Sequence, residues 1–390
     1  MKDRIINRVE EIGKELLQLS RDIHGCPETA FEERKAARWQ KELLERHGFT
    51  VEMPFCAMET AFRAVKKGRE EGPTVAFLSE YDALKGLGHA CGHNIIAASS
   101  VGAGIALGSV LEDIAGEVQV IGTPGEEEGG GKIYMVERGC FAGVDFALMV
   151  HPNTKNLIGR GGLAAQSVRI EFLGRAAHSA VPDKGVNALT SLIAFFNGID
   201  TLRQTWPNSA KINGIITRGG TASNVIPDLA EACFTVRAST KKELNAMYRD
   251  LNRVAEAAAM VTGASFLLEG EPVYAERYPN SAMGEAFKRN MESLGETMEY
   301  PDPRERFGSS DVGNVSLELP TIHEYLAIAD TSVAGHTVEF REAAVSPRGG
   351  EVVLLAAEGL ALTGWDLLTD GDLREAAREE YRRNVLPFRD

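Results

Sequence analysis

Residues 74–94 read Thr-Val-Ala-Phe-Leu-Ser-Glu-Tyr-Asp-Ala-Leu-Lys-Gly-Leu-Gly-His-Ala-Cys-Gly-His-Asn. The first five residues form an apolar run that predicts a buried strand. Glu80 to Asn94 then carry two acids, two histidines and a cysteine within fifteen positions. A thiolate, an imidazole and a carboxylate that converge are typical ligands of a transition metal. Cys91 alone would be interpreted as a small core residue, so the metal interpretation depends on further ligands downstream.

Length and charge exclude several classes of protein. With 390 residues, 44% of them hydrophobic, we expect two domains and a sizeable core. The net charge of −14 argues against nucleic-acid binding and fits a soluble cytoplasmic protein. Neither a signal peptide nor a membrane span is expected, because the required apolar runs are absent from the sequence. Five cysteines at irregular spacing predict no disulfide framework, so four are expected to be reduced and structural: Cys26, Cys56, Cys140 and Cys233.

The first part of the chain alternates strands with helices. This order predicts an α/β sheet with helices on both faces. Ligands of such sheets gather at the carboxyl ends of the strands, and the polar residues after Leu78, Gly122 and Val150 lie at such ends. The predicted helices are 4–23, 30–47 and 95–111, and the predicted strands are 49–53, 61–66, 74–78, 118–122 and 147–150.

The rhythm changes at about Ala164. A βαββαβ order there predicts a self-contained, ferredoxin-like domain inserted into the α/β domain. The ligand-rich pattern resumes afterwards, so we expect a first domain made of residues 1–163 and 273–390, interrupted by residues 164–272. The inserted elements are strands 167–173, 212–218, 229–238 and 265–268 with helices 186–205 and 241–262; helix 281–294, loop 308–311, strand 321–328, loop 335–337 and helix 343–362 follow.

Residues 122–132 (Gly-Thr-Pro-Gly-Glu-Glu-Glu-Gly-Gly-Gly-Lys) place three adjacent acids after a buried strand. Such acids are costly to hold together unless a cation neutralises them or water surrounds them. A solvated acidic turn is one interpretation. The preceding strand favours the other, in which the acids reach the sheet edge. One carboxylate could then bind a metal while its neighbour acts as a base toward an activated water.

Two more histidines extend the candidate site. His151 closes the next strand and His336 lies in a Gly-His-Thr loop, and either one alone would usually be structural. Together with Cys91, His93 and one acid of residues 126–128 they supply five ligands. Five exceed the needs of one tetrahedral zinc ion and suit two metals that share a bridging group.

The inserted domain contributes two polar loops and one arginine. His178 lies in residues 174–179, just after a strand, and Asn224 lies in the Gly/Asn/Pro-rich residues 219–228. Both segments could be mere connections, or they could donate hydrogen bonds to a developing oxyanion or a substrate carboxylate. Arg237 could pair with a carboxylate, although a structural salt bridge is the favoured interpretation.

Six motifs in this order resemble the amidohydrolase branch of the aminoacylase/glutamate-carboxypeptidase family of metallopeptidases. The resemblance covers nearly the whole chain, and it is closest to aminoacylase-1-like dipeptidases and aminobenzoyl-glutamate hydrolases. The motifs are residues 88–94 (Gly-His-Ala-Cys-Gly-His-Asn), Pro124 with Glu126-Glu127, His151-Pro152, residues 174–178 (Gly-Arg-Ala-Ala-His), residues 224–228 (Asn-Val-Ile-Pro-Asp) and Gly335-His336-Thr337.

The resemblance implies a zinc-aminopeptidase-like catalytic domain with an inserted lid that forms a homodimer. It implies hydrolysis of an N-acyl amino acid, a dipeptide or an aminobenzoyl-glutamate-like substrate with two divalent ions, zinc being favoured over manganese or cobalt. The residue roles that it implies are Cys91 as bridging ligand, His93, Glu127, His151 and His336 as further ligands, Glu126 as general base, His178 and Asn224 on the scissile carbonyl or substrate carboxylate, often across the dimer interface, and Asp82 as the group that orients a ligand.

Three departures from the family pattern affect these assignments. Glu128 stands where the family usually has Gly, so Glu127 and Glu128 both remain candidate ligands. Lys85 replaces a usual Pro beside the metal loop. Asn94 in place of Asp points to the dipeptidase and aminobenzoyl-glutamate sub-branch.

Two rival functions fit only part of the pattern. A non-catalytic homologue of the same fold would be expected to lack part of the ligand set, and here the set is complete. A cysteine hydrolase could use Cys91 with His93, but it would explain neither the three adjacent acids nor His336.

Overall fold

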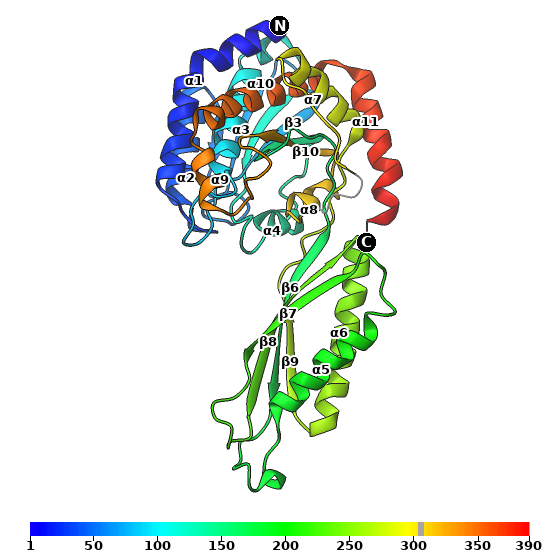
Figure 1. The fold of residues 1–390 in the computed structure, drawn as a ribbon. Coiled ribbons are helices and arrows are strands. Elements are labelled where there is room, and N and C mark those ends of the chain that lie inside the picture. The colour runs from blue at the N-terminus through cyan, green and yellow to red at the C-terminus, as the bar shows by residue number, and fades with distance from the viewer. Residues whose placement is uncertain (303–307, 390) are drawn as a thin grey trace. The chain divides into compact units, whose positions relative to one another are not determined.

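The computed structural model describes residues 1–302 and 308–389 (Figure 1). The chain divides into two compact units, which are residues 1–161 with 277–389, and residues 162–276. We call them the catalytic unit and the inserted unit. For comparison, the sequence pattern places the two borders after residues 163 and 272.

A six-stranded mixed sheet forms the centre of the catalytic unit, in the order β1-β2-β4-β3-β5-β10. The four strands from β4 to β10 are parallel, and β1 and β2 are antiparallel additions at one edge. The strands are β1 (Thr50–Glu52), β2 (Phe62–Lys67), β3 (Thr74–Ser79), β4 (Glu117–Gly122), β5 (Phe146–Asn153) and β10 (Thr321–Ala327).

Helices cover both faces of this sheet. The innermost, α3, packs on β3, β4 and β5 and is itself covered by α1 and α10, whereas α4 and α8 pack together on the other face (Figure 1). The helices are α1 (Lys2–Gly25), α2 (Arg34–Arg46), α3 (His93–Gly108), α4 (Gly131–Glu137), α7 (Ser281–Ser293), α8 (Val312–Ser316), α9 (Val338–Ala343), α10 (Pro347–Thr369) and α11 (Gly371–Asn384).

Strand β5 shows why both faces are buried. Phe146, Leu148 and Val150 belong to the core beneath α3, and Ala147 and Met149 belong to the core on the α4 side. Side chains alternate between the two faces of a strand, so a continuous apolar run is what a strand covered on both faces requires.

Helix α3 is buried along its whole length, and its small residues allow that position. A Cβ added at Gly104 would lie 2.3 Å from Val120 Cγ2, and one added at Gly102 would lie 2.6 Å from Leu16 Cδ1. Two segments, residues 93–113 and helix α10, are long and apolar enough to cross a membrane by composition. Their most apolar windows are 94% and 67% buried within the protein, as expected of core helices.

The inserted unit confirms the predicted ferredoxin-like order. Its antiparallel sheet has the order β7-β8-β6-β9, and α5 and α6 bury a core that includes Phe172, Phe195 and Leu251. Its elements are β6 (Ala164–Leu173), α5 (Ala188–Leu202), β7 (Lys211–Arg218), β8 (Leu229–Ala238), α6 (Lys241–Thr262) and β9 (Ser265–Gly270).

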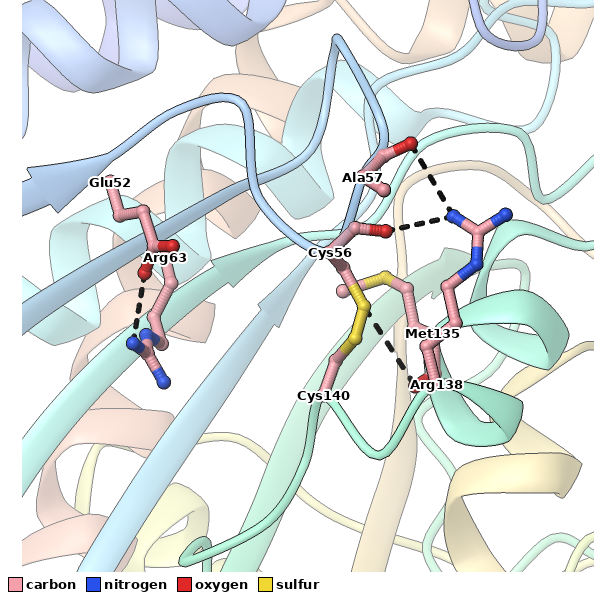
Figure 2. Close-up of a disulfide and its surroundings, with 7 residues drawn as sticks. All are labelled: Glu52, Cys56, Ala57, Arg63, Met135, Arg138 and Cys140. Atoms are coloured by element: carbon pink, nitrogen blue, oxygen red, sulfur yellow. Dashed lines mark hydrogen bonds and ion pairs between the residues drawn. A yellow bond between two sulfur atoms is a disulfide. The ribbon is translucent and has the colours of Figure 1, made fainter.

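A disulfide joins Cys56 to Cys140, with 6.0 Å between their Cα atoms (Figure 2). The prediction that both cysteines are reduced is therefore wrong, whereas Cys26, Cys91 and Cys233 are free. The two partners are 84 positions apart, and sequence spacing does not reveal that the two loops meet. Arg138 holds the same loop, because its Nη1 donates hydrogen bonds to the carbonyl oxygens of Cys56 and Ala57 at 2.8 and 3.4 Å.

Glu324 in β10 is a fully buried acid. Its Oε2 accepts a hydrogen bond from the Gly159 N–H at 2.9 Å, and its Oε1 has no hydrogen-bond partner. Burial raises the pKa of this carboxyl from 4.5 to about 8. The folded protein therefore retains a proton that the unfolded chain loses between these two values, and stability falls as the pH rises through that range.

We predict that Glu324→Gln flattens this fall and raises the free energy of unfolding relative to the parent above pH about 8, the folded pKa of Glu324. Urea unfolding across this pH range measures the effect. Glu296→Gln is the control with the opposite sign, because hydrogen bonds from Arg348 lower the pKa of Glu296. Parallel pH curves for Glu324→Gln and the parent would contradict the prediction.

Candidate active site

The candidate ligands gather at the carboxyl edge of the parallel strands. Cys91 and His93 follow β3, Glu126 and Glu127 follow β4, and His151 lies near the end of β5. Strand β3 lies between β4 and β5, so the segments that follow these strands share one edge. His336 joins them from the loop before α9.

Cys91 is at the centre of this group. Its Sγ lies 3.7 Å from His151 Nε2 and 3.4 Å from His336 Nε2. Cys91, His93 and His151 form one triad of possible metal ligands, and Cys91, Glu127 and His336 form a second. Within each triad the ligand atoms lie within 4.8 Å of one another, so Cys91 belongs to two neighbouring sites.

The geometry favours Glu127 over Glu128 as the carboxylate of this group. Glu127 Oε1 lies 3.8 Å from His93 Nε2, and its Oε2 lies 3.8 Å from His336 Nε2. Glu128 is exposed. Glu126 Oε2 lies 4.0 Å from His93 Nε2, which places this second acid beside the two triads.

Backbone conformation fixes two of these segments. Gly92 has φ +79°, and a Cβ there would lie 2.5 Å from Pro152 Cγ, so the turn into α3 requires glycine. His336 has φ 61°, a left-handed conformation that is uncommon outside glycine. Its N–H donates to the Ala90 carbonyl at 3.0 Å, which ties the His336 loop to the Cys91 loop.

Asp82 orients the ligands from beneath. Its Oδ1 lies 3.0 Å from His93 Nδ1, and its Oδ2 accepts a hydrogen bond from the Glu127 N–H at 2.8 Å. Burial would raise the pKa of Asp82, but His93 lowers it below its ordinary value. His151 Nδ1 lies 2.7 Å from the Pro152 carbonyl oxygen. In both histidines Nδ1 is engaged, and Nε2 is left for the cluster, which is the usual arrangement in metal sites.

Three buried atoms of this region have no hydrogen-bond partner: His93 Nε2, Glu127 Oε1 and Glu80 Oε2. Buried polar atoms are rarely left in this state, and an unpaired buried carboxylate is especially costly. A divalent cation would satisfy such atoms. The mixture of thiolate, imidazole and carboxylate suits zinc and neighbouring transition metals, so these residues fit two divalent ions.

A buried lysine is the main feature that the sequence pattern did not predict. Lys132 Nζ lies 2.6 Å from Glu80 Oε1 and 2.8 Å from Asp311 Oδ1, and all three side chains are buried. Glu126 completes the group, and burial together with Glu80 and Asp311 raises its pKa well above its ordinary value. An available signal was that Glu80 and Asp311 lie in segments already singled out, although nothing in the sequence paired them with Lys132.

The inserted unit brings two of its three candidate residues together. His178 forms an isolated β-bridge with Val225, and the Ser179 N–H donates to the Asn224 carbonyl at 3.0 Å. Arg237 lies near the other end of β8, in register with Ala165 and Lys211. The eight residues from the start of β8 to Arg237 span roughly 26 Å, so Arg237 does not join the His178 loop.

In the catalytic unit the cluster opens onto a cavity of about 500 Å³, lined by Cys91, Glu126, Glu127, His151 and His336. This volume is within the range of small-molecule sites. A substrate in the cavity would therefore meet the thiol, both acids and both imidazoles.

Comparison with known proteins identifies the family. Residues 159–261 match the peptidase dimerisation domain. The chain is 36% identical to the Xaa-Arg dipeptidase of Mus musculus over 98% of this chain and 92% of that protein. The chain belongs to the M20 family of peptidases. This M20 peptidase is also 30% identical to a p-aminobenzoyl-glutamate hydrolase polypeptide of Escherichia coli, over 75% of this chain and 65% of that protein.

Solved structures agree with the fold. A dinuclear metal-binding M20 peptidase from Bacillus subtilis superposes with a TM-score of 0.68 at 23% identity, over 90% of this chain and 98% of that chain. An aminobenzoyl-glutamate utilization protein from Klebsiella pneumoniae gives 0.72 at 18% identity, over 94% and 100%. The predicted family resemblance and fold class are confirmed, and this M20 peptidase is a hydrolase of amide or peptide bonds.

We predict that Lys132→Met strongly destabilises the protein. The substitution leaves Glu80 and Asp311 buried without their shared cation, and loss of one partner of a buried pair costs about 3–5 kcal/mol. The free energy of unfolding in urea measures this loss. Arg34→Met is the matched control, because Arg34 and its partner Glu59 are 66% and 71% exposed, and such pairs contribute about 0–1 kcal/mol. Equal losses in the two variants would contradict the prediction.

Proposed function

We propose that this M20 peptidase is a two-metal dipeptidase or amidohydrolase that releases an amino acid from its amide bond. The observation that carries the proposal is the convergence of one thiol, three imidazoles and one carboxylate around Cys91. Buried ligand atoms without hydrogen-bond partners in the same place support it.

The residues divide between two ions that share Cys91. His93 and His151 would hold one ion, and Glu127 and His336 would hold the other, in keeping with the two triads. Asp82 would keep His93 in the tautomer that presents Nε2. Zinc is the ion that we favour for a thiolate and imidazole set, with manganese and cobalt as alternatives.

Glu126 acts as the general base in this proposal. When bound, the divalent ions polarise the scissile carbonyl and lower the pKa of water toward about 7. Glu126 takes a proton from the attacking water and delivers it to the leaving nitrogen. Burial among Glu80 and Asp311 raises the pKa of Glu126, which suits a carboxyl that must both accept and return a proton.

His178 and Asn224 would donate hydrogen bonds to the developing oxyanion or to a substrate carboxylate. They belong to the inserted unit, and the family resemblance implies that such residues often act across a dimer interface. We propose a homodimer through the inserted unit. The match to a peptidase dimerisation domain supports it, as do Ile215 and Ile216 of edge strand β7, which are 67% and 46% exposed.

The relatives favour a dipeptide that ends in a basic residue. The mouse and human Xaa-Arg dipeptidases match 98% of this chain at 36% and 35% identity. We propose cytoplasmic hydrolysis of Xaa-Arg dipeptides, with aminobenzoyl-glutamate and N-acyl amino acids as the alternatives. Assays of all three substrate types with zinc, manganese and cobalt added separately would rank them.

We predict that Glu126→Gln lowers kcat by about 10²- to 10⁴-fold, the usual contribution of a general base. Metal content should stay that of the parent, because Glu126 belongs to neither triad around Cys91. Steady-state assays on alanyl-arginine and elemental analysis of the same preparation measure both quantities.

Glu128→Gln is the matched control two positions away. Glu128 is exposed, so this variant should keep the parental kcat. Near-parental turnover by metal-loaded Glu126→Gln would show that another group is the base. A Glu128→Gln variant as inactive as Glu126→Gln would show that the assignment of the acids is displaced.

A further inference from the structure

His323 in β10 is a buried polar side chain that the proposed reaction does not use. It is 3% exposed, and among the described residues neither of its ring nitrogens has a hydrogen-bond partner. It lines the same cavity as Cys91. Its ring centroid lies 5.4 Å from that of His151 and 4.9 Å from that of Tyr325, so it adjoins the ligand cluster.

An imidazole always carries at least one N–H donor, whichever its tautomer or charge. Leaving a buried donor unsatisfied is costly, and such a group calls for a partner such as a ligand or an ordered water. His323 belongs to none of the ligand triads. Its partner is therefore to be sought in the cavity, beside the metal ligands.

Arg277 brings a positive charge to the same cavity wall. It is 7% exposed, and it donates hydrogen bonds to the carbonyl oxygens of Arg160 and Gly161 and to Tyr325 Oη, at 3.2, 2.9 and 2.7 Å. All of these acceptors are neutral. The guanidinium carbon also lies 5.7 Å from the centroid of the Tyr325 ring.

The acid that senses this guanidinium is Glu324, the neighbour of His323 along β10. Burial raises the pKa of Glu324 to about 8, so this acid is protonated at neutral pH and does not compensate Arg277. A buried cation held only by neutral groups is a costly arrangement. Its cost falls when an anion enters the cavity.

We propose that Arg277 and His323 form a subsite for a carboxylate of the substrate, with Tyr325 holding Arg277 in place. A guanidinium and an adjacent N–H donor are suited to a carboxylate. The proposal rests on the proposed function, because the carboxylate belongs to the amino acid that hydrolysis releases.

Two carboxylates could occupy the subsite, namely the α-carboxylate of that amino acid or the side chain of an acidic residue. Because His323 adjoins His151, the subsite lies next to the candidate metal ligands. In the substrate only one carbon separates the α-carboxylate from the scissile nitrogen. This proximity favours the α-carboxylate and would restrict the enzyme to substrates with a free carboxyl end.

Paired substrates test the subsite kinetically. We expect the parent to prefer alanyl-arginine to alanyl-argininamide, which lacks only the charged carboxylate. Arg277→Met should lower kcat/KM for the free acid by about 10- to 100-fold, the range for a hydrogen bond to a charged group, mainly through KM. The kcat/KM for the amide should stay near the parental value.

Two further variants separate the subsite from general effects. Arg348→Met removes a cation that pairs with Glu296 and does not line the cavity, so it should leave the acid-to-amide ratio unchanged. His323→Phe should reduce the ratio in the same direction as Arg277→Met, whereas His323→Gln, which keeps an N–H donor, should retain part of it. The His323 variants keep the test available if Arg277→Met fails to fold.

Calorimetry separates this proposal from the hydrolase assignment, because it needs no turnover. Arginine should bind the metal-loaded parent at least about tenfold more tightly than agmatine, which lacks the carboxylate, and Arg277→Met should abolish the difference. If 4-aminobutyrate binds as tightly as glutamate, in an Arg277-dependent way, the subsite takes a side-chain carboxylate. Equal binding of arginine and agmatine, together with equal affinity of glutamate and Arg277-independent 4-aminobutyrate, would overturn the proposal and leave His323 to an ordered water.

Discussion

A concentration of buried negative charge at the carboxyl edge of the central sheet is the constraint on which the catalytic unit depends. Glu80, Asp82 and Asp311 are fully buried there, and Glu126 and Glu127 are nearly so. Lys132 compensates Glu80 and Asp311, and His93 faces Asp82. The remaining charge, with the thiol at its centre, requires cations from solution, so the fold and the chemistry have the same electrostatic origin.

The parallel strands make this concentration of charge possible. Strands β4, β3 and β5 end at one edge, and each is held by a continuous apolar run that is buried on both faces. The rigid sheet then positions short loops whose polar side chains could not otherwise be held so close together. The inserted unit has a core of its own, so the His178 and Asn224 loops can be positioned independently of the metal ligands.

Much of the candidate site was predictable, because each candidate ligand follows a recognisable apolar strand or lies in a motif. Lys132, His323 and Arg277 were not, because their partners are far away in the sequence; Lys132 and Asp311 are 179 positions apart. Helices α4, α8 and α9 span at most seven residues, too few for a helical period to emerge. Helix α10 begins at Pro347 rather than 343, although Ser346 as N-cap and Pro347 in the first turn were readable signals.

The proposed mechanism requires that two divalent ions share Cys91. Anomalous diffraction from crystals of the metal-loaded protein, recorded at the absorption edge of the bound metal, tests this requirement without any assay of turnover. We expect two peaks on either side of Cys91 Sγ, one bordered by His93 and His151 and the other by Glu127 and His336. A fully active crystalline enzyme with a single peak, or with no peak near Cys91, would contradict the shared ligand.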